Sequence, residues 1–268
     1  MLSSLAVPIQ ELLSKAGGEW GIVLEDLTTK DRWTLNEDQR FFAASLIKVP
    51  IMTAVFTEAY AGKFAFEDKL KLRQEDLVGG NGVLQHMTPG TELTILDLVT
   101  LMIIQSDNTA TNIMIDLVGK EPIREAMRKT EMANSQFYNK LMIVPAELVG
   151  YNEVTAADMA SHLRYLATGK IISYNSCLQM INILKKQQLR DSIPLHLPDP
   201  EGDVIGAIQR WEFAGKSGSV TNIQHDTGIL YIGQNAITVC TLSKNVEPIL
   251  ARDTMGRIGR LVYELYTR

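Results

Sequence analysis

Ser45 and Lys48 are the first residues whose types and spacing suggest chemistry. They stand three residues apart in the stretch AASLIKVPIMTAVF, which is otherwise almost entirely apolar. A serine hydroxyl becomes a good nucleophile only when a base removes its proton, and residues at i and i+3 share one face of a helix. Apolar burial lowers the pKa of a lysine towards the neutral form that a base requires. For this stretch alone, a structural explanation is better than a nucleophile and its base: Ser45 would cap a helix, and Lys48 would lay its stem on the core with its charge in water.

Two further motifs follow in order along the chain. The triplet S-D-N at residues 106–108 comes directly after an apolar run, and the triplet K-S-G at residues 216–218 lies on an expected strand. Taken alone, the first would merely cap a helix that begins at Thr109, and the second would be a turn or a β-bulge. Their meaning therefore depends on whether the fold brings them to Ser45.

The periodicity of apolar residues predicts the elements that must position these motifs. Helical spacing occurs at residues 5–15, 45–60, most of 64–187, and from Pro248 onwards. Strand-like alternation occurs at residues 19–27, 31–38, 211–219, 226–233 and 236–243. Strands thus stand at both ends of the chain and helices fill the middle. This order predicts an α/β fold of the α+β type.

The predicted architecture is an antiparallel five-stranded sheet built from the N- and C-terminal segments and flanked by helices, with an inserted all-helical subdomain. We expect a single domain over residues 1–268. Its sheet subdomain would comprise residues 1–60 and 200–268, and its helical subdomain residues 61–199. The interface between two such subdomains is a favoured place for a binding site.

Composition narrows the classes of partner. The chain has 268 residues, a formal net charge of −5 and 46% hydrophobic residues, as in an ordinary globular protein. Its charges are scattered, so we expect no nucleic-acid partner. The longest apolar run, Leu93–Gln105, is too short to span a bilayer and predicts a buried helix. The four histidines lack metal-ligand spacing, so we expect no metal and no cofactor.

The cysteines and the N-terminus do not narrow the class of protein further. Cys177 and Cys240 lie in apolar contexts, so we expect them to be small core residues. The N-terminal stretch has no basic region and carries Glu11 early, which is not typical of a signal peptide. The sequence leaves open both a cytoplasmic location and one reached after removal of a leader.

The three motifs together resemble a known family. S-x-x-K, S-D-N and K-[ST]-G in this order are the signature of class A β-lactamases and penicillin-binding proteins. The chain is similar to that family over most of its length, and GVLQHMTPGTELTILDLVTLMIIQSDNTATN resembles the family's stretch before and through its middle motif. The resemblance implies a β-lactamase/transpeptidase-like fold and a serine hydrolase that opens cyclic amides through an acyl-enzyme on Ser45. With it we expect a monomer that acts on a small-molecule substrate, a β-lactam or an acyl-D-alanyl peptide.

The resemblance also implies roles for the other motif residues. Ser106 would carry a proton to the leaving nitrogen, and Asn108 would contact the substrate amide. Lys216 and Ser217 would hold the substrate carboxylate. Ser217 stands where the family signature has threonine, but it keeps the hydroxyl group, so the implied role is retained.

Two backbone N–H groups would form the oxyanion hole. One belongs to Ser45, where an expected helix begins and backbone donors are unpaired, and the other belongs to Ser219. Lys216, packed beside Lys48, would be the second cation that lowers the pKa of Lys48. His225 is a candidate catalytic base by residue type. A Ser-His-Asp enzyme needs a nucleophile elbow such as G-x-S-x-G, which is absent, so we expect His225 to be structural.

The chain departs from the family in the loop that serves deacylation. Class A β-lactamases carry E-x-x-L-N there, and its glutamate holds the hydrolytic water; the corresponding region, NKLMIVPAELVGYNEVTAADMA, lacks the pattern and is shorter. One alignment places Val144 or Pro145 at the glutamate position. Another lets Glu147 serve, with Asn152 beside it, and Glu153 is a weaker candidate.

This departure leaves three hypotheses open. The first is a class A β-lactamase-like hydrolase whose Ser45 acyl-enzyme is hydrolysed with the help of Glu147. The second is a D-alanyl-D-alanine peptidase-like or esterase-like penicillin-binding protein that deacylates slowly. The third is a penicillin-acylated sensor or scaffold that does not act as an enzyme. The fate of the acyl-enzyme distinguishes them.

Overall fold

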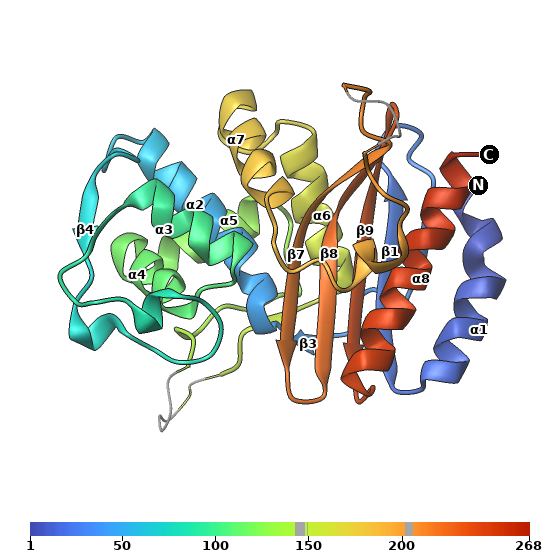
Figure 1. Cartoon of the computed structure of the whole chain (residues 1–268), viewed down its shortest axis with the longest axis horizontal. Coiled ribbons are helices and arrows are strands. Elements are labelled where there is room, and N and C mark those ends of the chain that lie inside the picture. The colour runs from blue at the N-terminus through green and yellow to red at the C-terminus, as the bar shows by residue number, and fades with distance from the viewer. Residues whose placement is uncertain (143–147, 149, 202–205) are drawn as a thin grey trace.

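A five-stranded antiparallel sheet forms the centre of the computed structural model, which describes residues 1–142, 148, 150–201 and 206–268. The strands lie in the order β2-β1-β9-β8-β7 (Figure 1). Their bounds are β1 Glu19–Asp26, β2 Arg32–Leu35, β7 Trp211–Val220, β8 Ile223–Ile232 and β9 Asn235–Lys244. The two ends of the chain meet where β1 pairs with β9. The predicted sheet, with N- and C-terminal strands, is therefore confirmed.

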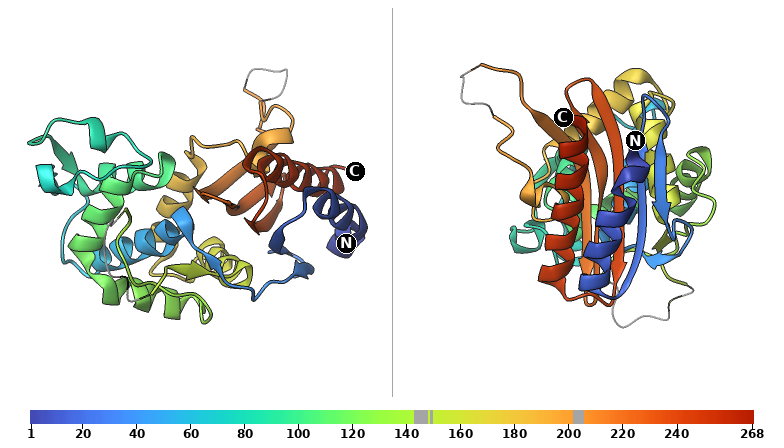
Figure 2. Two further views of the ribbon diagram at one scale, coloured as in Figure 1. Left: turned by 90° about the horizontal axis from the view of Figure 1, so that it is seen from below. Right: turned by 90° about the vertical axis from the view of Figure 1, so that its right-hand side faces the viewer.

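Two helices from opposite ends of the chain cover one face of the sheet. α1 (Ala6–Ala16) and α8 (Pro248–Tyr266) lie side by side on this face (Figure 2). α6 (Ala156–Ala167) packs on the other face, against β1 and β9. Side chains alternate along a strand, so Ile22 and Leu24 enter the core beneath the terminal helices, whereas Val23 enters the core beneath α6.

The middle of the chain is mainly helical, as predicted. Its other helices are α2 Lys48–Tyr60, α3 Ile95–Ile104, α4 Asn108–Val118, α5 Lys120–Lys129 and α7 Tyr174–Lys185. The short strands are β3 Phe41–Phe42, β4 Lys69–Lys71, β5 Glu92–Thr94 and β6 Glu153–Val154. Single 3₁₀ turns are η1 Leu2–Leu5, η2 Ala44–Ile47, η3 Gln74–Asp76, η4 Leu84–His86 and η5 Ile193–His196. The predicted boundaries between a sheet and a helical subdomain stay a prediction.

α2 is the central helix of this region. Every residue from Lys48 to Phe56 is buried, because α3, α4, α5 and α7 all pack against it. The helix predicted from Ser45 onwards differs at its start, since Ser45 lies in η2 and the α-helix begins at Lys48. The apolar run Leu93–Gln105 contains the largely buried α3, as expected. Among the described residues, no helix has the length and apolar character needed to cross a membrane.

Candidate active site

The side-chain nitrogen of Lys48 lies where the first two sequence motifs meet. Its Nζ is 3.0 Å from Ser45 Oγ and 3.0 Å from Ser106 Oγ. It is also 2.6 Å from the carbonyl oxygen of Ser106 and 2.8 Å from Asn108 Oδ1. Two segments some 60 residues apart in the chain are thereby joined through one nitrogen atom.

The partners of Lys48 limit which hydrogen bonds its nitrogen can donate and which it can accept. Ser106 O and Asn108 Oδ1 can only accept hydrogen bonds, whereas the hydroxyls of Ser45 and Ser106 can donate or accept. A neutral amine has two N–H bonds and one lone pair. In that form Lys48 would donate to the two obligatory acceptors and its lone pair would accept a hydrogen bond from one hydroxyl, as a base requires.

The surroundings of Lys48 favour its neutral form. Its side chain is fully buried. Burial first, and the positive charge of Lys216 second, hold the pKa of Lys48 well below its usual value, with Asp107 opposing them. Desolvation and a like charge both disfavour the ammonium form. Apolar residues around a lone lysine thus have the electrostatic effect that the sequence suggested.

Lys216 reaches the same hydroxyl from the sheet. It lies on β7, and its Nζ is 3.1 Å from Ser106 Oγ and 2.7 Å from the carbonyl oxygen of Ser217. Burial lowers the pKa of Lys216 to about 7, and the negative charge of Asp226 partly offsets that effect. Ser106 Oγ therefore lies between two lysine nitrogens, which is suitable for passing a proton.

Backbone conformations with positive φ occur at Ser106 itself and at the residue that precedes Ser45. Ser106 has φ of 53°, and Ala44, which precedes Ser45, has φ of 44°. Residues other than glycine rarely adopt this region, and such strain concentrates at functional sites. At Ser106, the hydrogen bonds that its oxygen atoms accept from Lys48 and Lys216 hold the residue in place.

Asp107 fixes the loop that faces the nucleophile. Its Oδ1 accepts from the N–H of Ala110 as the N-cap of α4, and its Oδ2 accepts from the N–H groups of Val83 and Leu84. Asn108 adds a bond from Nδ2 to the carbonyl oxygen of Gly79. The glycine-rich stretch GGNG at residues 79–82 is thereby held against the start of α4, a positioning role that its sequence does not indicate.

β7 passes close to the nucleophile at Gly218. A Cβ atom at this position would lie 3.0 Å from the backbone nitrogen of Ser45, so glycine allows the strand to approach the start of η2. Ser219 follows on the same strand and lines one cavity together with Ser45. The predicted oxyanion hole from the N–H groups of Ser45 and Ser219 stays a prediction.

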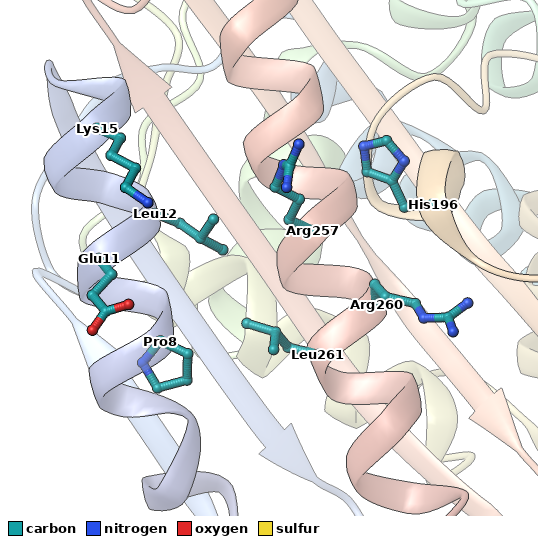
Figure 3. Close-up of a pocket in the computed structure, with 8 residues that line it drawn as sticks. All are labelled: Pro8, Glu11, Leu12, Lys15, His196, Arg257, Arg260 and Leu261. Carbon is teal, nitrogen blue, oxygen red and sulfur yellow. The ribbon is translucent and has the colours of Figure 1, made fainter.

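The cavity at Ser45 is small and mixed in character, with a volume of about 160 Å³. Its lining includes Asn108 and Asn152 as polar groups and Phe42 and Val220 as apolar ones. A larger cavity of about 400 Å³ lies between α1 and α8, with Lys15, Arg257 and Arg260 among its lining residues (Figure 3). None of the predicted site residues that the structure describes lines this second cavity.

His225 lies in the sheet as a structural residue. It is buried on β8, with Nε2 3.0 Å from the carbonyl oxygen of Phe42 and Nδ1 3.2 Å from the N–H of Ser243. Burial lowers its pKa to about 4. The side chain is thereby engaged in holding β3 against the sheet, in keeping with the structural role expected for it.

The deacylation loop is described only in part. Glu147 lies outside the described residues, as do Val144 and Pro145. Asn152 is buried and lines the Ser45 cavity, with Oδ1 accepting from the N–H groups of Tyr138 and Asn139.

The position of Asn152 suggests an alignment that the sequence analysis did not consider. In E-x-x-L-N the glutamate precedes the asparagine by four residues, so counting back from Asn152 gives Leu148, which is 43% exposed. The weaker candidate, Glu153, pairs with Phe42 through β6 and β3. The signal that was missed is the spacing from Asn152.

Seven of the eight predicted site residues are described, and they gather around the start of α2. Five form the hydrogen-bonded cluster, namely Ser45, Lys48, Ser106, Asn108 and Lys216. Ser217 accepts from Lys216 through its carbonyl oxygen, and Ser219 lines the cavity. Their catalytic roles stay predictions.

Comparisons with known proteins agree with the motifs. Residues 4–266 match the model of the family described as the beta-lactamase enzyme family. The chain is 31% identical to a β-lactamase structure from Sphaerobacter thermophilus, with a TM-score of 0.90 and coverage of 100% of this chain and 98% of the other. Over 118 residues it is 28% identical to β-lactamase VEB-1 of Pseudomonas aeruginosa, an alignment that covers 43% of this chain and only 40% of that enzyme.

The fold is also shared with a penicillin-binding protein. The structure of PBP-A matches with 24% identity and a TM-score of 0.86, covering 99% of this chain and 97% of the other. A variant of PBP-A in which leucine is replaced by glutamate has been solved as an acyl-enzyme complex with penicillin G. The resemblance and the fold predicted from the motifs are confirmed.

Proposed function

Because this chain belongs to the β-lactamase enzyme family, we propose that it opens β-lactam rings through an acyl-enzyme formed on Ser45. One observation supports this most strongly: the buried Nζ of Lys48 lies 3.0 Å from Ser45 Oγ while a second lysine approaches the same cluster. A solvated lysine would stay protonated and could not act as a base. The burial of Lys48 supplies what the chemistry requires.

Acylation begins with proton transfer from Ser45 to neutral Lys48. Ser45 Oγ then bonds to the β-lactam carbonyl carbon, and the charge that develops on the carbonyl oxygen is stabilised by the N–H groups of Ser45 and Ser219. Loss of one such donor typically slows acyl transfer by about 10² to 10³.

Ring opening completes the transfer. The C–N bond breaks, and the hydroxyl of Ser106 gives its proton to the leaving nitrogen while Lys48 returns a proton to Ser106. The distance of 3.0 Å between Lys48 Nζ and Ser106 Oγ supports this route. The proton that left Ser45 thus reaches the leaving nitrogen, and Lys48 is neutral again. Lys216 and Ser217 hold the substrate carboxylate during these steps.

Hydrolysis of the acyl-enzyme needs a group that activates water. In the proposed β-lactamase reaction Glu147 holds this water. The alignment through Asn152 instead places Leu148 there, and a leucine cannot act as a base. This spacing favours a second candidate function, a penicillin-binding protein of the same family that acylates at Ser45 and deacylates slowly.

Mass spectrometry of the intact protein during a time course with benzylpenicillin tests both functions. An adduct that forms on the wild type and decays as penicilloate accumulates supports the β-lactamase. An adduct that persists for hours supports the second function. No adduct, or an equal adduct on Ser45→Ala, contradicts both. The exposed Ser4→Ala variant is the matched control and should behave as the wild type.

Two variants at one position separate the functions further. If Leu148 occupies the glutamate position, Leu148→Glu should shorten the lifetime of the adduct by at least about tenfold, as expected for general-base assistance. Leu148→Gln introduces a polar side chain of similar size without a base and should not do so. Equal lifetimes for the two variants would contradict this alignment.

A further inference from the structure

A buried glutamine joins α3 to β7 at a point away from the reacting groups. Gln187 lies just beyond the end of α7, and only 4% of its surface is exposed. Its Nε2 donates to the carbonyl oxygen of Ile103 at 3.0 Å and makes a longer contact, 3.4 Å, with that of Gly215. Its Oε1 accepts from the backbone N–H of Leu189 at 3.0 Å. Both ends of the amide are therefore engaged, as is usual for a buried polar group.

Both carbonyl groups belong to positions where backbone acceptors lack a regular partner. Ile103 lies in the last turn of α3, where carbonyl oxygens have no intrahelical donor. Gly215 lies on β7, the edge strand of the sheet, which has a neighbouring strand on one side only. The backbone N–H of Gln188 adds a bond of 3.1 Å to the carbonyl oxygen of Ile104. The stretch after α7 thus ties the end of α3 to the edge of the sheet.

The same two elements lead directly to reacting groups. Ser106 comes three residues after Ile103, and Lys216 follows Gly215 immediately. Lys216 Nζ lies 3.1 Å from Ser106 Oγ. The end of α3 and β7 are therefore joined twice, once through Gln187 and once through the pair of side chains that face the substrate.

The distance between these two side chains depends on the distance between their elements. Lys216 moves with its strand, because it is fully buried and its Nζ also donates to the carbonyl oxygen of Ser217 on β7. Ser106 moves with α3, because the backbone N–H of Asp107 donates to the carbonyl oxygen of Leu101. A contact that holds β7 at the end of α3 thus also holds Lys216 at Ser106.

We infer that Gln187 is a positioning residue that sets the distance between Ser106 and Lys216 for acylation. This inference rests on the proposed function. Without the bonds from Gln187, β7 can move away from the end of α3, and Lys216 Nζ then moves away from Ser106 Oγ. A displacement of about 1 Å at a reacting group can slow catalysis by about 100-fold.

The same movement changes the charge that acts on Lys48. The other charges that influence the two lysines are Asp107, at the start of α4, and Asp226 on β8. The positive charge of Lys216 lowers the pKa of Lys48, so a more distant Lys216 allows that pKa to rise. The rate of acylation should then begin to increase at a higher pH. A general loss of stability would not produce this shift in the protein that stays folded.

Gln187→Met tests the inference, because methionine has a similar length but no group that donates to the two carbonyl oxygens. The measurement is the second-order rate constant for acylation of the full-length protein by benzylpenicillin, followed by mass spectrometry across pH. We expect this constant to fall at least about tenfold and the acid limb of its profile to move to higher pH. Gln188→Met is the matched control. Gln188 is exposed and its side chain donates to the carbonyl oxygen of Lys186, so both quantities should stay as in the wild type.

Gln187→Asn provides a second readout if the methionine variant folds poorly. Its amide is one methylene shorter and cannot reach both carbonyl groups, so it should shift the rate and the acid limb in the same directions. Two outcomes would overturn the inference. One is a folded variant at residue 187 that keeps the wild-type rate and profile. The other is a slower rate with an unmoved acid limb, which would indicate a merely structural role. Failure of the proposed function looks different, because then the wild type itself would gain no adduct on Ser45.

Discussion

Two lysines approach a single hydroxyl group, that of Ser106, and their charges cannot be independent. Lys48 Nζ and Lys216 Nζ lie 3.0 and 3.1 Å from Ser106 Oγ. Each ammonium destabilises the other, so the pair favours one positive charge over two. In the proposed mechanism the neutral member is Lys48, as the base, and the charged member is Lys216, as the carboxylate ligand.

This division of charge predicts a bell-shaped pH dependence of acylation. As pH rises, the rate should first increase while Lys48, whose pKa is well below its usual value, loses its proton. The rate should then fall as Lys216 loses its proton, since burial lowers its pKa to about 7. The second-order rate constant with benzylpenicillin, measured between about pH 5 and pH 9, checks this profile.

Asp226 allows the alkaline limb to be assigned. Its negative charge raises the pKa of Lys216, and burial raises the pKa of Asp226 itself to about 7. Removal of this charge in Asp226→Asn should therefore move the alkaline limb to lower pH. Glu67→Gln removes an exposed carboxylate instead and should leave the profile unchanged. A limb that stays in place, or moves to higher pH, in Asp226→Asn would contradict the role given to Lys216.

At the scale of elements, the start of α4 combines capping with chemistry. The sequence offered a helix cap and a catalytic motif as alternative explanations of S-D-N. The structure shows that Asp107 is the N-cap of α4, while Ser106 and Asn108 on either side of it face Lys48. The two explanations are compatible because one triplet serves both purposes.

The loop before α4 predicts an unusual sensitivity at Gly82. A Cβ atom there would lie 2.3 Å from Cγ of Asp107, so Gly82→Ala should displace the cap and slow acylation by at least about tenfold, as expected for a misplaced catalytic group. Gly62 also has positive φ but open space around it. Gly62→Ala should therefore introduce only the backbone strain of a positive φ, without a steric clash.

Acylation kinetics and thermal unfolding of the two glycine variants provide the test. We expect both variants to lose some stability, by roughly 1 kcal/mol from the strained backbone, with a larger loss in Gly82→Ala. Only Gly82→Ala should lose activity. Equal acylation rates would show that the loop does not position Ser106 and Asn108.

Sequence alone predicted which motif residues meet but not how their supports are built. The i, i+3 spacing of Ser45 and Lys48 and their apolar surroundings were enough to expect a base with a lowered pKa. The contacts of Asp107 with the N–H groups of Val83 and Leu84 join segments more than 20 residues apart. No local pattern encodes such a contact, so the sequence alone does not indicate that this loop supports the site.

At the scale of the whole molecule, the sheet has two separate cores. The core that contains Ile258 lies between the sheet and the terminal helices, and the core that contains Met52 lies on the other side with α2. The lysine pair belongs to the second side. Damage to the first core should therefore reduce stability without changing the chemistry.

Ile258→Ala tests this separation. The side chain is fully buried on α8, so its truncation should lower the free energy of unfolding by about 2 to 5 kcal/mol. The acylation rate of the folded fraction should be unchanged. Ile249→Ala, at an exposed position on the same helix, should affect neither quantity. Urea denaturation measures the stability and acylation kinetics measure the activity. If folded Ile258→Ala reacts with benzylpenicillin more slowly than the wild type, the two cores are coupled.

The fold as a whole was predictable because two periodicities occupy different parts of the chain. Strand-like alternation at both ends and helical spacing between them leave few ways to build one sheet. The strand order and the pairing of β1 with β9 depend on contacts between residues more than 200 positions apart, so the sequence pattern alone could not determine the register.

The most direct test of the central claim is to find which residue carries the acyl group. Trypsin cleavage after Arg40 and Lys48 releases the peptide FFAASLIK, in which Ser45 is the only serine. After brief reaction with benzylpenicillin and an acid quench, we predict that this peptide gains the mass of one benzylpenicillin, and that the corresponding peptide of Ser45→Ala does not. An adduct on a different peptide, or none at any reaction time, would contradict the proposal that Ser45 is the nucleophile.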